Sequence, residues 1–165
     1  MPNNITIREF KESDIEGALK VWNEVVRDGV AFPQTCELTV NDGLEFFKAQ
    51  TYTGVAVDEI NEVVGIYIVH PNNIGRCGHI ANASYAVSSN MRGLHIGEKL
   101  VRDSLAQAKR SGFRIMQFNA VVATNLSARH LYEKIGFIQL GTICGGFKDK
   151  NGTYVDICPY YIELR

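Results

Sequence analysis

The sequence predicts an α/β (α+β) fold, with about four helices packed on a mixed central sheet of about seven strands. Apolar residues recur at helical spacing in some segments, whereas other segments alternate apolar and polar residues or form short apolar runs, as strands do. The resulting element order is β-α-α-β-β-β-α-β-α-β-β. Alternation of strand, helix and strand in the middle favours parallel pairing there, and the strand runs on either side favour antiparallel pairing.

The N-terminal third of the chain predicts one strand and two helices. Residues 5–10 alternate apolar and polar side chains, as a half-buried strand does. Residues 13–16 have the S-x-x-E form of a capping box that starts a helix. Residues 28–37 form a predicted loop, interrupted at Pro33, and residues 39–50 predict a weaker helix. The apolar stripe of the first helix consists of Ile15, Ala18, Leu19, Trp22, Val25 and Val26.

The middle of the chain predicts three strands and the third helix. Residues 54–57 and 62–70 form strands joined by a tight turn, and residues 79–87 form the next strand. A helix is predicted over residues 94–111, and Gly112 follows it where a left-handed C-cap is expected. The inward-facing side chains of this helix are expected to be Ile96, Leu100, Val101, Leu105 and Ala108.

The C-terminal third predicts a strand, a short helix and a hairpin. Residues 115–122 form the strand, and residues 125–135 form a helix that ends at Gly136. Residues 137–147 and 153–164 form the two arms of a final hairpin. One face of the strand is expected to consist of Met116, Phe118, Ala120 and Val122.

Composition is that of an ordinary soluble protein, and we expect one domain over residues 1–165. Hydrophobic residues make up 45% and charged residues 21% of the 165 residues, and a net charge of −1 leaves no basic field to attract nucleic acid or an anionic membrane. The start of the chain lacks the apolar region of a secretion signal, and no apolar run is long enough to span a membrane. A cytoplasmic protein is therefore expected.

The four cysteines do not predict a metal site. Cys36, Cys77, Cys144 and Cys158 show none of the Cys and His spacings that zinc sites use. The histidines are scattered along the chain. We therefore expect free thiols and no metal.

The first segment that carries chemistry is Y-A-V-S-S-N-M-R-G-L-H-I-G, residues 85–97. In it a strand ends and a glycine-containing loop opens directly into a helix, which gathers backbone N–H groups and the positive end of a helix dipole around one point. Gly93 and Gly97 allow close backbone approach, and Arg92 adds charge. The segment predicts an anion site, although such glycines also occur at turns that bind nothing. It matches neither a P-loop nor a dinucleotide fingerprint.

The second such segment is N-L-S-A-R-H-L-Y-E-K-I-G-F, residues 125–137. Asn125 and Ser127 lie at the start of the predicted helix, where they can cap it or contact a ligand. Tyr132 follows Asn125 by two helical turns along the same face. By itself this pattern is also that of a short capped helix with a core aromatic residue.

Together, and in this order along nearly the whole chain, the two segments resemble the GNAT N-acetyltransferase superfamily. In that family an R/Q-x-x-G-x-G/A loop holds the pyrophosphate of coenzyme A (CoA) through backbone amides, and a later L-Y-E-K-x-G-F stretch is a hallmark. The resemblance implies the GNAT fold, in which two central parallel strands, here residues 79–87 and 115–122, are splayed apart. It also implies an N-acetyltransferase that moves acetyl from acetyl-CoA to a small amine by direct attack.

The resemblance implies the cofactor contacts and the catalytic acid residue by residue. The backbone around Val87 and Ser89 would pair with the pantetheine arm, which Asn125 and Ser127 would contact from the other side. Tyr132 matches the general acid, whose phenol protonates the CoA sulfur. The pyrophosphate loop corresponds to Arg92, Gly93, Leu94, His95, Ile96 and Gly97.

His95 departs from the family pattern, because it stands where the family has its middle glycine. We expect the backbone there to be helical or nearly so, a conformation open to a non-glycine residue, and CoA binding to survive. The histidine side chain would then crowd the pyrophosphate or add a hydrogen-bond donor to it.

Two asparagines and one aromatic residue are candidates for the acceptor side. Asn82 and Asn119 interrupt apolar strands near the expected wedge, where an unpaired amide costs about 1–3 kcal/mol. They are either satisfied structural residues or donors for a substrate carboxylate. Residues 71–83 and 118–125 resemble the proline-analogue N-acetyltransferases, whose carboxylate-binding asparagines they match, which implies a small amino or cyclic imino acid. Phe32 lies in a loop that often shapes the acceptor pocket in this family, and a surface aromatic without function is the alternative.

Several functional questions stay open at this level. The general base is undecided among Glu24, His79, Asp156 and a water chain. The alternative functions are a catalytically weak CoA-binding regulatory module and an acetyltransferase of protein N-termini or lysines. A small-molecule enzyme predicts that residues 28–37 cover the acceptor site. Many relatives are dimers, so a homodimer is one expectation, although no segment identifies an interface.

Overall fold

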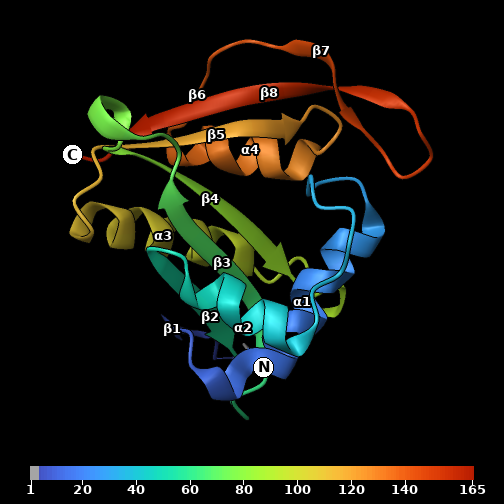
Figure 1. The fold of residues 1–165 in the computed structure, drawn as a ribbon, viewed down its shortest axis with the longest axis vertical. Coiled ribbons are helices and arrows are strands. Elements are labelled where there is room, and N and C mark those ends of the chain that lie inside the picture. The colour runs from blue at the N-terminus through green and yellow to red at the C-terminus, as the bar shows by residue number, and fades with distance from the viewer. Residues whose placement is uncertain (1–3) are drawn as a thin grey trace.

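One mixed sheet runs through residues 4–165, the part of the chain that the computed structural model describes (Figure 1). The expectation that residues 1–3 begin no secretion signal lies outside this part. The strand order is β1-β2-β3-β4-β5-β8-β6, and β7 also pairs with β8. Neighbouring strands are antiparallel except for the parallel pair β4 and β5. The eight strands described are β1 (Thr6–Glu9), β2 (Tyr52–Val57), β3 (Val63–Pro71), β4 (Ile80–Val87), β5 (Ile115–Val122), β6 (Ile138–Gln139), β7 (Ile143–Lys148) and β8 (Tyr154–Glu163).

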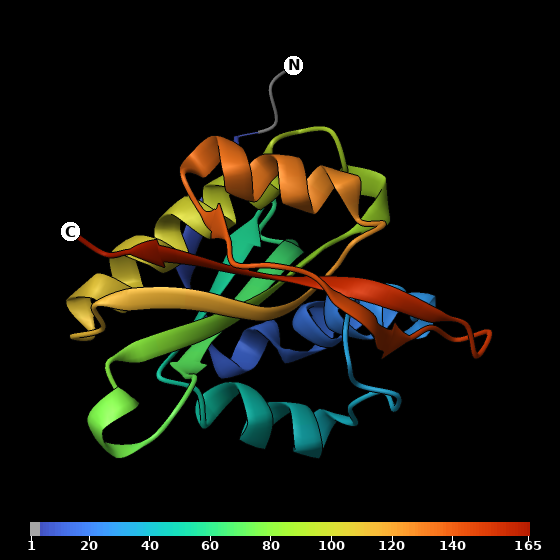
Figure 2. The same cartoon turned by 90° about the horizontal axis from the view of Figure 1, so that it is seen from above.

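The α-helices of the described residues cover the two faces of this sheet. Figure 2 shows α1 and α2 on one face and α3 and α4 on the other. Each face has its own buried core, one around Trp22 and the other around Leu100 and Met116. None of the described helices is long and apolar enough to cross a membrane. The helices are α1 (Ile15–Asp28), α2 (Val40–Lys48), α3 (Ile96–Arg110) and α4 (Leu126–Ile135), with the short 3-10 helices η1 (Glu12–Asp14), η2 (Gly75–Cys77) and η3 (Ser89–Met91).

The fold class predicted from the sequence is confirmed, and the helix patterns hold in detail. The whole predicted stripe of α1 is buried. Gly112 and Gly136 follow α3 and α4 with φ angles of 90° and 113°, a region that glycine enters without strain. In α3, Ser104 is fully buried, whereas Leu105 of the predicted inward set is only partly buried.

The arm predicted over residues 137–147 is two strands, which is why the sheet has more strands than expected. β6 ends at Gln139 and β7 begins at Ile143. Between them the side-chain amide of Gln139 donates to the Gly141 carbonyl (2.9 Å) and contacts the Thr142 hydroxyl (3.3 Å). These local bonds compete with the sheet ladder and divide the arm.

A β-bulge in β5 interrupts the predicted alternation that put Ala120 on one face with Met116, Phe118 and Val122. Phe118 pairs with Tyr160 and Val121 with Cys158, so two residues of β5 oppose Pro159 alone. Proline has no N–H to donate to a ladder, and it is tolerated in an inner strand where a bulge removes the need for that bond. Ala120 is consequently exposed, as is Asn119 beside it.

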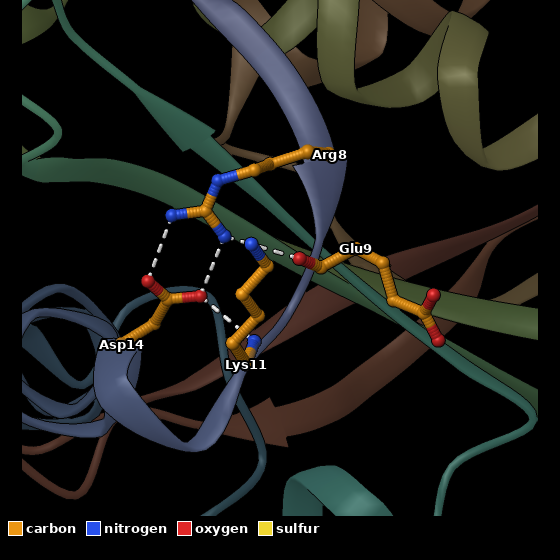
Figure 3. Close-up of polar contacts among 4 residues, drawn as sticks. All are labelled: Arg8, Glu9, Lys11 and Asp14. Atoms are coloured by element: carbon orange, nitrogen blue, oxygen red, sulfur yellow. Dashed lines mark hydrogen bonds and ion pairs between the residues drawn. The ribbon is translucent and has the colours of Figure 1, made fainter.

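α1 begins where predicted, but the prediction that Ser13 caps it is wrong. Asp14 stands at the N-cap position of α1 without a side-chain bond to the helix, and its carboxylate instead closes the turn of η1. Asp14, not Ser13, accepts the hydrogen bond from the Lys11 N–H (2.8 Å), and its carboxylate also pairs bidentately with the Arg8 guanidinium (2.7 and 2.9 Å; Figure 3). Ser13 lies within η1. Burial opposes ionisation of Asp14, but the Arg8 guanidinium and the Lys11 N–H outweigh it and hold the pKa of this carboxyl below its ordinary value. The partner that selects Asp14 comes from β1, which a local capping pattern does not include.

Asp14→Asn is expected to lower the free energy of unfolding by about 2–3 kcal/mol at pH 7. It removes the charge from a largely buried carboxylate that accepts hydrogen bonds from both Arg8 and Lys11. Because the pKa of Asp14 is lowered by folding, the wild type has this stability above the unfolded pKa of about 3.9 and loses it as the pH falls through the folded value. Urea unfolding at pH 7 and pH 2 measures both effects. Glu16→Gln, at an exposed position of α1, is the control. An equal loss at the two pH values would contradict this assignment.

β4 and β5 pair only at their first residues and then diverge (Figure 1). The described parallel ladder joins Ile80 to Ile115 and Ala81 to Met116. On their outer sides both strands stay paired, β4 with β3 as far as Val87 and β5 with β8 as far as Val122. The divergence forms an open wedge whose inner strand edges lack ladder partners in the described structure. The splayed central pair that the resemblance implied is therefore present.

Candidate functional site

A cavity of about 760 Å³ lies at the wide end of the wedge. Its walls come from the end of β4, the loop before α3, α4 and the C-terminal part of α1. Sites for small molecules and cofactors have volumes of about 300–1,000 Å³, so the cavity is large enough for a ligand. The predicted site residues that line it are Val87, Arg92, Gly93, His95, Ile96, Gly97, Asn125, Ser127 and Tyr132.

The cavity meets the N-terminus of α3. The Lys99 N–H donates to the His95 carbonyl (3.2 Å) as the first helical bond, so the N–H groups of Ile96, Gly97 and Glu98 have no partner within the helix. The nearest atom to a Cβ added at Gly97 would be Leu131 Cδ2, at 3.7 Å. Free N–H groups, the positive end of the helix dipole and a missing side chain together form an anion site.

The backbone at His95 is left-handed, which overturns the expectation of a helical conformation. Its φ and ψ are 58° and 19°, and the only other non-glycine residue with positive φ in residues 4–165 is Asn61. A left-handed conformation costs an L-residue about 1–2 kcal/mol. The backbone at this point of the anion loop is therefore one that suits glycine, and the histidine is held in it under strain.

His95→Gly is expected to raise the free energy of unfolding by about 0.5–1 kcal/mol, because relief of left-handed strain exceeds the added chain entropy of glycine. Asn61→Gly is the matched control, since Asn61 has the same backbone region (φ 67°) in a turn far from the cavity in sequence. Chemical denaturation measures both variants. A loss of stability in His95→Gly beside a gain in Asn61→Gly would show that the histidine side chain supports the loop.

Tyr132 is half-buried in α4 and lines the cavity. Its ring packs against Phe118 and Phe137, with centroid separations of 4.6 and 5.5 Å, and against Tyr160 at 6.1 Å. Burial raises the pKa of Tyr132 above its ordinary value. The phenol therefore keeps its proton at neutral pH and can donate it into the cavity.

Asn125 caps α4 as its position in the sequence suggested. Its side-chain oxygen accepts from the Ala128 N–H (3.3 Å) and from the Ser127 hydroxyl (3.3 Å). These two bonds orient the start of α4, where Asn125 and Ser127 line the cavity. Asn125 is thus the cap of α4 and also a residue of the cavity wall, and its contact with a ligand stays a prediction.

Two carboxylates of α1 contact the loop that precedes α3. Glu24 accepts from the Ser89 N–H (3.4 Å), and Asp28 pairs with Arg92 (3.5 Å). The hydrogen bond from Ser89, with the positive charges of Arg92 and Arg27, lowers the pKa of Glu24. Ser89 and Leu94 lie in this loop but are not among the residues that line the cavity.

Sequence reasoning missed three charged residues of the cavity wall, Asp28, Glu98 and Lys134. Lys134 donates to Glu98 (2.7 Å) and so joins α4 to the first turn of α3. Acidic residues are common in the first turn of a helix and basic residues in the last turn. The positions of Glu98 and Lys134 in the sequence therefore did not distinguish them as site residues. Among residues 4–165, no cluster of three or more His, Cys, Asp or Glu side chains could hold a metal ion.

Asn82 and Asn119 lie on the opposite face of the sheet from Tyr132. On β4 and β5, Ala83 and Phe118 belong to the core beneath α3, and alternation along a strand turns Asn82 and Asn119 toward the α1 side. Asn82 accepts from the Ala83 N–H (2.8 Å). Asn119 exchanges two hydrogen bonds with Asn72 (3.2 and 2.6 Å). A ligand in the cavity can meet this amide face only through the open wedge.

The remaining candidates are not among the residues that line the cavity. Phe32 is 8% exposed, and its ring centroid lies 4.5 Å from that of Trp22 in the core beneath α1, so it is not a surface aromatic. Its contact with an acceptor stays a prediction. Asp156 accepts from the Gly145 N–H (2.9 Å), and His79 is exposed before the narrow end of the wedge. None of the three candidate bases, Glu24, His79 and Asp156, is therefore among the residues that line the cavity.

The model of the acetyltransferase (GNAT) family matches residues 19–137, which contain the wedge, the anion loop and Tyr132. The chain belongs to the GNAT family. As a GNAT N-acetyltransferase it is an acetyl-CoA-dependent acyltransferase. Its mixed sheet with a splayed parallel pair is the arrangement that the resemblance implied for the family.

Individual relatives agree with the GNAT assignment. N-acetyltransferase aca1 of Schizosaccharomyces pombe (strain 972 / ATCC 24843) is 30% identical over 156 residues, covering 84% of this chain and 74% of that protein. A GCN5-related N-acetyltransferase from Kribbella flavida is 31% identical with a TM-score of 0.89, covering 96% and 97% of the two chains. A GNAT superfamily phosphinothricin acetyltransferase from Sinorhizobium meliloti, solved with acetyl-CoA, shares the fold at 22% identity and a TM-score of 0.90, covering 99% and 89%.

Proposed function

We propose that this GNAT enzyme acetylates the nitrogen of a small amino or cyclic imino acid, with Tyr132 as the general acid. The observation that carries the proposal is the meeting of three features in one cavity. These are the anion site at the start of α3, the free strand edge near Val87 and the half-buried phenol of Tyr132. A pyrophosphate, an amide-containing arm and a thiol leaving group require these three features.

The cavity residues fit acetyl-CoA from its phosphates to its thioester. The N–H groups at the start of α3, in the loop of residues 92–97, would hold the pyrophosphate. The amides of the pantetheine arm would pair with the inner edge of β4 near Val87 and Ser89, because β5 has left that edge free. Asn125 and Ser127 would contact the arm from the start of α4. The thioester would then lie inside the wedge.

Tyr132 would serve the step in which CoA leaves. The neutral nitrogen of the acceptor attacks the thioester carbon, the C–S bond breaks, and the sulfur takes the bonding electron pair. Tyr132 donates its hydroxyl proton to that sulfur and regains one from water, while the acetylated nitrogen releases its proton to water. Because burial raises the pKa of Tyr132, the phenol carries the proton that this step needs.

The acceptor would approach from the face of the sheet opposite to Tyr132. Asn82, Asn119 and their neighbour Asn72 present neutral amide groups there, which suit a carboxylate better than a polycation. The wedge lets an acceptor on this face reach a thioester held from the other. The S. meliloti structure is named as that of a phosphinothricin acetyltransferase, and phosphinothricin is a small amino acid, which supports this acceptor class.

A thiol-release assay with acetyl-CoA and a panel of amines tests the acceptor class. The panel contains proline analogues, free amino acids, polyamines, aminoglycosides and short peptides. We expect the highest kcat/KM for a free amino or imino acid. The highest value for a polyamine or a peptide would contradict the proposed acceptor and leave the acetyl-CoA side intact.

Asn119→Ala is expected to raise the KM of the best acceptor about tenfold, the loss of about 1.4 kcal/mol for one charge-assisted hydrogen bond. The KM of acetyl-CoA should not change. Asn151→Ala, in the exposed turn between β7 and β8, is the control. The methyl ester of the same acceptor lacks the carboxylate, so wild type and variant should use it equally. An equal loss for acid and ester would show that Asn119 does not bind the carboxylate.

A further inference from the structure

α4, which carries Tyr132, rests lightly on the sheet. None of its residues from Leu126 to Ile135 is fully buried. Leu131, Tyr132 and Ile135 are the partly buried apolar residues of α4 that pack on the core beneath α3. Apolar burial normally fixes a helix on a sheet, and here it is small. The position of the Tyr132 phenol therefore depends on other contacts.

Arg129 supplies such contacts on three strands. Its guanidinium donates to the Ala123 carbonyl just after β5 (3.1 Å), to the Gln139 side chain at the end of β6 (3.3 Å) and to the Tyr160 hydroxyl of β8 (3.1 Å). Arginine holds its donors in one rigid plane, so three acceptors on separate elements fix both the direction and the distance of the helix. Arg129 lies one helical turn before Tyr132, on the same side of α4.

Tyr160 is the centre of this network. Its side chain is fully buried, and its ring packs edge-on against Tyr132 at a centroid distance of 6.1 Å. Its hydroxyl accepts from Arg129 and donates to Glu133 (2.9 Å). Burying a hydroxyl without a hydrogen-bond partner costs folding free energy, so the Tyr160 hydroxyl requires the partners that Arg129 and Glu133 provide. Arg129 and Glu133, which lie on either side of Tyr132 along α4, are thus both bound to the Tyr160 hydroxyl.

We propose that Arg129 and Tyr160 are positioning residues that set the reach of the Tyr132 hydroxyl toward the CoA sulfur. The inference rests on the proposed function of Tyr132 as general acid. Neither Arg129 nor Tyr160 lines the cavity, so both act through Tyr132. Proton donation requires the phenol within hydrogen-bond reach of the sulfur, and a displacement of about 1 Å lowers the rate strongly.

Tyr160→Phe tests the proposal, because it removes only the hydroxyl and leaves the ring against Tyr132. We expect kcat to fall about tenfold, with the Kd of CoA and the KM of the acceptor unchanged. In a Tyr132→Phe background the same change should have no further effect on kcat, because there is no acid left to position. Tyr154→Phe, which removes a hydroxyl from the exposed end of the same strand, is the matched control.

Arg129→Lys is a second variant, since it keeps the positive charge and removes the planar set of donors. It should repeat the pattern of Tyr160→Phe, and melting temperatures confirm that each variant is folded. Equal losses of kcat in the wild-type and Tyr132→Phe backgrounds would overturn the proposal and leave the network a structural support. A Tyr132→Phe enzyme with wild-type kcat would instead remove the proposed acid itself, and with it the reason for positioning.

Discussion

Tyr132→Phe is expected to lower kcat by about 100-fold to 10,000-fold, the usual contribution of a general acid. Without the phenol the CoA thiolate must leave unprotonated or wait for a proton from water. The ring remains against Phe118 and Phe137 and the hydrogen bonds of Arg129 are untouched, so α4 should stay in place. Steady-state kinetics with thiol release, beside calorimetric titration with CoA, separates the lost chemistry from binding, which should stay within about threefold.

The pH dependence of the wild type gives an independent check on Tyr132. Burial raises its pKa, so the proton is present at neutral pH and is lost only as the pH rises through that raised value. The wild-type kcat should therefore not decline on the alkaline side before the ordinary tyrosine pKa of about 10. A kcat that is unchanged in Tyr132→Phe would contradict the assignment of the acid, whatever the pH profile.

Gly97→Asp is expected to weaken CoA binding at least about 100-fold, about 2.7 kcal/mol, without destabilising the fold. The new carboxylate would stand at the anion site of α3 and repel a pyrophosphate. The fold should tolerate it, because Gly97 has no left-handed φ and its nearest neighbour is Leu131 Cδ2 at 3.7 Å. An acid in the first turn even favours a helix, by about 0.3–1 kcal/mol. Calorimetric titration and thermal melting measure the two effects separately.

Gly97→Ala is the control for size at this position. It adds the same Cβ without charge, so its CoA affinity should lie within a few-fold of the wild type. If Gly97→Asp bound CoA as tightly as Gly97→Ala does, the pyrophosphate would lie elsewhere. If both variants lost binding equally, close backbone approach rather than charge would control this site.

Local patterns in the sequence were enough for most of the fold and for the anion loop. The stripe of α1 and the glycines after α3 and α4 depend on neighbours within one or two turns, and such periodicities are visible in a single chain. The loop of residues 92–97, Asn125 and Tyr132 were singled out for the same reason, and the functions that the resemblance to a family implies for them stay predictions. All but Leu94 of these residues line the cavity.

The predictions that failed depend on contacts between distant segments. Asp14 caps its turn because Arg8 comes from β1, and Ala120 is exposed because Pro159 lies opposite it in β8. The alternative that Phe32 is a surface aromatic is wrong, because its contact with Trp22 buries it. His95 was expected to adopt a helical backbone, since nothing local requires a histidine to be left-handed. Periodicity carries none of this information.

Amide NMR during successive additions of CoA and an acceptor tests whether the two ligands enter from opposite faces of the sheet. In the proposed arrangement CoA enters from the α3 face and the acceptor from the α1 face, with the wedge joining them. CoA alone should therefore shift the amides of Val87, Ile96 and Gly97, and the side-chain amides of Asn82 and Asn119 should move mainly when the acceptor follows. Shifts confined to Asn82 and Asn119 on adding CoA, with Gly97 unmoved, would contradict it.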